Sequence, residues 1–91
     1  MAHRTVVVAS KVGLHARPAK LFTQAASASG VGVRIAKGGG PAVDAASILR
    51  VMALGVKHGE EVTLTAEGEG ADDVLDGLVT LLATDLDAEQ A

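Results

Sequence analysis

The pattern of apolar and polar positions switches between the strand period and the helix period along the chain. Residues 5–9, which contain three consecutive valines, predict a short buried strand. A polar loop over 10–13 leads to residues 18–28, where apolar side chains recur at helical spacing and favour an amphipathic helix. Gly30 and Gly32 end this helix.

The middle of the chain predicts a β-hairpin. Over residues 31–36 apolar side chains occupy alternate positions, which is typical of a half-buried strand. The glycines at 38–40 tolerate the positive φ of a tight turn, and residues 41–43 return as a short strand. Because proline cannot donate to a neighbouring strand, Pro41 places the return strand at a sheet edge.

A brief second helix is predicted over residues 47–54. Ser47 is its N-cap, and Gly55 follows its last turn. Its apolar residues are too many for one buried stripe on two turns, so we expect some of them to be exposed: Ile48, Leu49, Val51 and Met52.

The last third of the chain predicts one more strand and one more helix. The strand covers residues 61–66, with Val62 and Leu64 pointing inward. The helix follows Gly70, and we expect residues 87–91 beyond it to fray. Aspartates near its start are favourable against the helix dipole: Asp72, Asp73 and Asp76. Its predicted core stripe contains Val74, Leu75, Leu78, Leu81, Leu82 and Leu86.

The resulting order, β-α-β-β-α-β-α, predicts an α+β fold. We expect a four-stranded, mainly antiparallel sheet covered on one face by three helices, an open-faced two-layer β-sandwich. With 91 residues, the sequence fits a single domain over 1–91.

Composition narrows the function. The absence of cysteine excludes disulfides and thiolate metal sites, and the single aromatic residue, Phe22, argues against base stacking. The net charge of −3 argues against nucleic-acid binding. No apolar stretch approaches the roughly 20 residues of a membrane span, and no secretory signal is visible, so we expect a cytoplasmic protein without membrane insertion.

The charges are unevenly distributed along the chain. All eight Lys and Arg lie in residues 1–59, and this part of the chain contains only one acidic residue, Asp44. The other ten of the eleven acidic residues lie in residues 60–91. The first two-thirds therefore offer a cationic surface to a partner, unless the acidic tail serves only solubility.

The segment Gly13-Leu14-His15-Ala16-Arg17-Pro18 contains the candidate chemistry. Proline is tolerated in the first turn of a helix, so Pro18 predicts the helix start and places His15 at or just before the N-cap. The backbone amides of Ala16 and Arg17, with the Arg17 guanidinium, would bind a phosphate dianion beside the imidazole. This arrangement suggests phosphorylation of His15; the alternative is a capping histidine next to a surface arginine.

That hexapeptide resembles the active-site signature of HPr, the histidine phosphocarrier family of the bacterial phosphoenolpyruvate-dependent sugar phosphotransferase system. The similarity covers nearly the whole chain, including the element order and residues 47–55. It implies that His15 accepts a phosphoryl group from enzyme I and passes it to enzyme IIA domains of sugar permeases. Arg17 would then clamp the phosphate and the Ala16 and Arg17 amides would bind it, in a phosphotransfer intermediate that is not an independent enzyme and needs no cofactor.

Ser47 matches the position of the family's regulatory phosphorylation site, which is used by an HPr kinase in some lineages. Ala46 stands where kinase-regulated relatives usually carry lysine. Two interpretations of Ser47 stay open here, a helix cap and a regulatory phosphosite.

The second predicted helix supplies a candidate docking surface. Exposed Ile48, Leu49 and Met52 would form an apolar patch beside His15, unless Ile48 or Met52 lies in the core. Cationic residues would surround the patch and steer acidic partners: Lys11, Lys20 and Arg50.

We expect a monomer whose partners are enzyme I, enzyme IIA domains and regulatory proteins. Two alternatives are a paralogue serving a nitrogen- or dihydroxyacetone-linked branch, and a regulatory module acting through the Ile48/Met52 patch. His3 and His58 are predicted to be surface residues, and no metal site is expected.

Overall fold

Seven elements follow one another in the predicted order in the computed structural model, which describes residues 2–84. The strands are β1 (Ala2–Val7), β2 (Val33–Lys37), β3 (Val43–Asp44) and β4 (Glu61–Ala66). The helices are α1 (Ala16–Ala28), α2 (Ile48–Ala53) and α3 (Ala71–Ala83).

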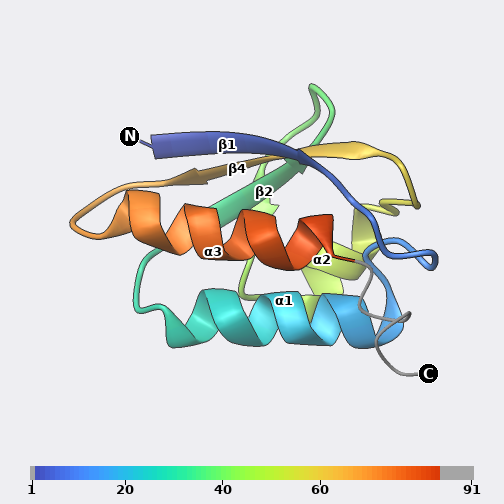
Figure 1. Cartoon of the computed structure of the whole chain (residues 1–91), viewed down its shortest axis with the longest axis horizontal. Coiled ribbons are helices and arrows are strands. Elements are labelled where there is room, and N and C mark those ends of the chain that lie inside the picture. Colours follow the sequence, from blue (N-terminus) through green and yellow to red (C-terminus); the bar gives the residue numbers. More distant parts are fainter. Residues whose placement is uncertain (1, 85–91) are drawn as a thin grey trace.

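The four strands form one antiparallel sheet in the order β1-β4-β2-β3. Figure 1 shows the three helices on one face of this sheet, with the opposite face open. The predicted α+β open-faced sandwich is therefore confirmed. The prediction that the return strand lies at an edge is also confirmed, because β3 pairs with β2 alone.

Strand register places one set of side chains between the layers. Val6 lies opposite Val62, and Ile35 lies opposite Leu64. All four are buried, as is Phe22 of α1, which is fully covered. Since burial of apolar surface is the main favourable term in folding, this small aliphatic core holds the helices on the sheet.

Several predicted boundaries were wrong, including that of β2, which covers 33–37 and not 31–36. β1 covers residues 2–7, not 5–9, and its valines are not all buried, because a strand with one open face leaves Val7 half-exposed. α1 begins at Ala16, two residues before Pro18. Proline is tolerated at this third helical position because an N–H there would have no partner within the helix. The return strand covers 43–44 and not 41–43.

The other two helices follow the sequence more closely. Ser47 is the N-cap of α2, and its Oγ accepts a hydrogen bond from the Arg50 N–H at 3.4 Å. Gly55 adopts φ +68° just beyond the helix, as a C′ residue does. In α3, Leu75, Leu78 and Leu82 are buried, whereas Val74 and Leu81 are partly buried. Leu86 and residues 87–91 lie outside the described residues.

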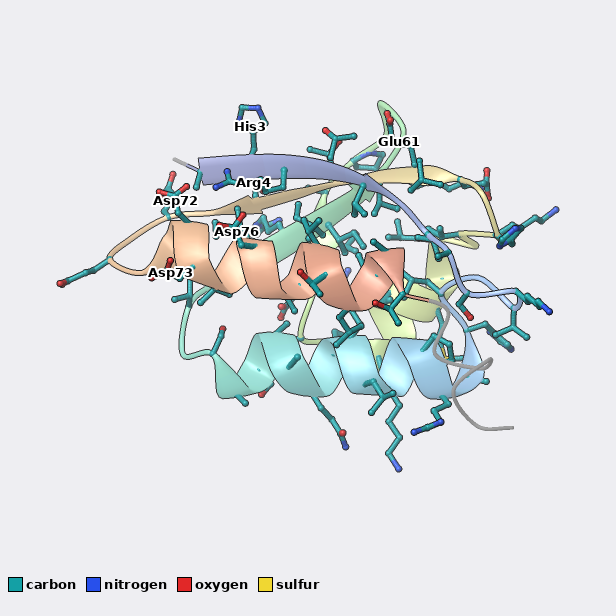
Figure 2. The ribbon with its side chains drawn as sticks, viewed as in Figure 1. His3, Arg4, Glu61, Asp72, Asp73 and Asp76 are labelled. Carbon is teal, nitrogen blue, oxygen red and sulfur yellow. The ribbon has the colours of Figure 1, made fainter. Side chains whose placement is uncertain are left out.

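An ion-pair cluster ties the start of β1 to the start of α3 (Figure 2). The Arg4 guanidinium donates to Asp76 Oδ1 and to Asp72 Oδ1, each at 3.0 Å. These hydrogen bonds raise the pKa of Arg4, and the bond to Asp76 has the largest effect. Two of the three aspartates expected to favour the helix dipole therefore also hold the edge strand against the helix layer.

Candidate functional site

His15 lies at the N-terminus of α1, at the end of the molecule opposite the start of β1 (Figure 1). It is the N-cap residue, with extended backbone angles, φ −144° and ψ 161°. The imidazole makes no capping hydrogen bond to the described helix, and the residue is exposed. His15 is therefore the capping residue by position, as the alternative expected, but its exposed ring makes no capping bond and is accessible to solvent.

The next residue has an unusual backbone. Ala16 adopts φ +51°, and it is the one non-glycine residue with positive φ among residues 2–84. This region costs an L-residue on the order of 1 kcal/mol or more, and such strain concentrates at functional sites. Because the first N–H groups of a helix have no partner within the helix, the amides at Ala16 and Arg17 are available to an anion at His15.

Exposed cations lie on α1, on α2 and in the loop that precedes α1. Arg17 and Lys20 of α1 are exposed, as are Lys11, which precedes the helix, and Arg50 of α2. Within residues 2–84 none of these four forms a salt bridge, whereas Arg4 and Lys37 do. Their positive charge is therefore available to a phosphoryl group or to an acidic partner.

Residues 8–14, here called the acceptor loop, lead from β1 to His15. They are fixed against residues 55–60, the α2–β4 turn, by backbone hydrogen bonds. Val8 exchanges two of them: its N–H donates to Glu60 O at 3.0 Å, and its carbonyl accepts from Gly59 N at 2.9 Å. Leu14, which is 1% exposed, donates to Val56 O at 3.0 Å. The backbone hydrogen bonds of this loop therefore fix the position of His15.

Gly13 allows the closest approach within this junction. It is buried with φ +71°, and its α-carbon faces the backbone of Val56 and Lys57. A Cβ at this position would overlap the Val56 carbonyl oxygen and lie 2.8 Å from Lys57 Cα. The glycine that opens the hexapeptide is therefore required by both conformation and space.

The α2–β4 turn is itself braced by Glu60. Its carboxylate accepts the Lys57 N–H at 2.7 Å and pairs with Lys37 Nζ at 3.3 Å. The Lys57 hydrogen bond, followed by the Lys37 ammonium, lowers the pKa of Glu60. Lys37 also donates to Gly55 O at 3.1 Å, so both ends of the turn are held.

The C-terminal end of α2 lies near this junction, because Val56 follows the helix closely and its carbonyl accepts the Leu14 N–H. Ile48 is 39% exposed and Leu49 is 80% exposed, while Val51 is fully buried. The prediction of a surplus apolar surface is confirmed for Ile48 and Leu49. Met52 is only partly exposed, because it packs in part against the core.

Val12 was missed by the sequence analysis. It is 50% exposed at the tip of the acceptor loop. The available signal was an apolar residue within an otherwise polar loop.

His3 and His58 are both exposed, as predicted, but they differ in their contacts. His3 lies on the open sheet face (Figure 2), whereas His58 Nδ1 lies 3.2 Å from the carbonyl oxygens of Ala9 and Ser10. No cluster of side chains that could hold a metal exists among the described residues. Neither of the two described grooves, the larger of about 530 Å³, includes His15.

None of the helices within residues 2–84 has the length and apolar character needed to cross a membrane.

Comparison with known proteins gives a consistent result. The family model described as "PTS HPr component phosphorylation site" matches residues 2–84. The chain is 49% identical over 87 residues to the phosphocarrier protein HPr of Streptomyces coelicolor, covering 96% of this chain and 94% of that protein. Among solved structures, HPr-C-His from Thermoanaerobacter tengcongensis has a TM-score of 0.84 and 40% identity, covering 90% of this chain and 91% of that one.

A structure of an HPr dimer from the same organism has a TM-score of 0.68 and 36% identity, covering 100% of this chain and 99% of that one.

Proposed function

Because the chain belongs to the HPr family, whose members transfer phosphoryl groups within the phosphotransferase system, we propose that His15 is its phosphoryl acceptor. The observation that supports this most directly is an exposed imidazole that makes no capping bond, placed at a helix N-terminus whose Arg17 forms no salt bridge within residues 2–84. In the proposed step, His15 Nδ1 attacks the phosphorus of phosphorylated enzyme I. The N–P bond of the donor breaks as the new N–P bond forms.

The surroundings of His15 suit a phosphoryl group that must be gained and then lost. The Ala16 and Arg17 amides and the Arg17 guanidinium offset the negative charge that the ring acquires. The exposed helix end leaves the phosphorus open to a second protein. His15 would therefore donate the group to a histidine of an enzyme IIA domain of a sugar permease.

The docking surface we propose consists of Ile48 and Leu49 with Lys20 and Arg50. A patch of exposed apolar side chains is typical of a protein contact surface. Exposed cations increase the association rate with an acidic partner. Met52 contributes less than its sequence position suggested, because it is partly buried. We propose that the protein acts in this way in the cytoplasm and as a monomer.

Ser47 is proposed to be a helix cap. Its Oγ already accepts the Arg50 N–H, which is the cap interaction, and the residue is only partly exposed. Phosphorylation at this position would add negative charge beside the docking surface and weaken its attraction for acidic partners.

The proposed function is tested by incubating the purified protein with phosphoenolpyruvate and enzyme I. We expect an acid-labile mass increase of about 80 Da, as one phosphoryl group adds. The increase should be absent when enzyme I is omitted and should disappear when an enzyme IIA domain is added. No mass increase with active enzyme I would contradict the proposal.

Arg17→Ala should slow phosphoryl acceptance about 100-fold, because a preorganised donor at developing charge is worth that order of rate. The midpoint of urea unfolding should not change, since Arg17 is exposed and makes no salt bridge in the described part of the chain. Quenched-flow measurement of the phosphorylation rate tests the first expectation.

Arg34→Ala is the matched control for this variant, because it removes an exposed arginine that lies outside the proposed site. It should be phosphorylated at the wild-type rate. An unchanged rate in Arg17→Ala would contradict the electrostatic role of Arg17, and a large loss of stability would show that Arg17 has a structural role.

A further inference from the structure

His58 connects two segments that are far apart in the sequence. Its Nδ1 lies 3.2 Å from Ala9 O and 3.2 Å from Ser10 O, across 49 and 48 positions. Both partners are carbonyl oxygens, which can only accept. The Nδ1 atom must therefore bear a proton, which it shares between the two carbonyls.

One of these carbonyls also closes the turn that precedes His15. Ser10 O accepts the Gly13 N–H at 2.9 Å, and the next residue, Leu14, donates to Val56 O. His58 therefore contacts the same oxygen that fixes the turn of the acceptor loop. The links at Val8 and Leu14 join backbone to backbone and can form with many sequences, whereas the His58 link depends on its side chain.

His58 lies on a turn that hydrogen bonds hold in place. The turn around it is closed by Glu60 N–H, which donates to Lys57 O at 3.1 Å, and by the Glu60 carboxylate, which accepts the Lys57 N–H. Gly59, the next residue, donates to Val8 O. A side chain on such a braced turn can restrain a loop without moving with it.

We propose that His58 is a positioning residue for phosphoryl transfer, whose Nδ1–H holds the Ala9 and Ser10 carbonyls and thereby fixes the path of the acceptor loop to His15. This inference rests on the proposed function of His15. His58 acts through the loop backbone and not on the phosphoryl group. Geometry at the acceptor matters because small displacements of a reacting group cost large factors in rate.

Two variants separate the hydrogen bond from the ring. His58→Ala removes the donor, whereas His58→Asn places an amide N–H close to the position of Nδ1. In His58→Ala, we expect hydrogen exchange of the Gly13 and Leu14 amides to accelerate about fivefold, as loss of one net hydrogen bond implies. The exchange of β4 amides should not change.

Phosphorylation by enzyme I should slow several-fold in His58→Ala, and His58→Asn should restore both the slow exchange and the rate.

The outcomes that would overturn this proposal are distinct. Unchanged exchange at Gly13 and Leu14, equal losses in both variants, or faster exchange throughout the sheet would each exclude positioning through Nδ1. Faster loop exchange with an unchanged transfer rate would do so too. If the wild-type protein accepts no phosphoryl group, the proposed function of His15 fails, while the exchange data still show whether His58 restrains the loop.

Discussion

His15→Ala is expected to abolish phosphoryl acceptance while leaving the fold intact. The substitution removes the nucleophile, and neither Ala16 nor Arg17 can replace it. The imidazole is exposed and makes no capping bond, so we expect the free energy of unfolding to change by less than about 0.5 kcal/mol. Mass spectrometry after incubation with phosphoenolpyruvate and enzyme I measures the first effect, and urea unfolding measures the second.

His3→Ala is the matched control. His3 is also exposed, but it lies on the open sheet face near the start of β1, away from the helix end that holds His15 (Figure 2). This variant should gain the phosphoryl group at the wild-type rate. A phosphoryl adduct that persists in His15→Ala would place the acceptor elsewhere in the chain and would refute the proposed function.

Gly13→Ala should destabilise the protein by more than about 3 kcal/mol, because left-handed strain and overpacking act together. The backbone there has φ +71°, and the new methyl group would meet main-chain atoms of Val56 and Lys57. Neither is the flexible end of a side chain that could move away. Since the chain has no Trp or Tyr, far-UV circular dichroism in urea is the suitable measurement.

Gly30→Ala isolates the part of that effect that comes from backbone strain. Gly30 has nearly the same dihedral angle, φ +73°, but a methyl group there would have no atom within 4 Å. It should cost only about 1 to 2 kcal/mol, the strain alone. Equal losses in the two variants would show that the acceptor loop can move away from the α2–β4 turn.

The element order and the place of the candidate site in the fold could be predicted because local patterns specify them. The alternation over residues 31–36, the cap at Ser47 and the glycine after α2 each have one favourable local structure. The helix N-terminus at His15 follows from Pro18, although the structure moves the start to Ala16. The resemblance to the HPr family likewise depends on the local hexapeptide 13–18 and on residues 47–55, together with the element order.

Contacts between distant segments could not be predicted in this way. Nothing near His58 in the sequence indicates that Ala9 and Ser10 lie within hydrogen-bonding distance of its ring. Register also decided which valine of β1 faces the core, because Val6 lies opposite Val62 while Val7 points to the open face. The position of Met52 likewise depends on how α2 packs.

The placement of charge at the two ends of the molecule has a consequence for encounter with a partner. Asp72, Asp73 and Asp76 begin α3 at one end, and Arg17 begins α1 at the other (Figures 1 and 2). Among the described residues, the protein therefore carries negative charge at the start of α3, which Arg4 offsets in part, and positive charge at the start of α1. In the field of an acidic partner it experiences a torque that turns the His15 end forward before contact, which shortens the rotational search.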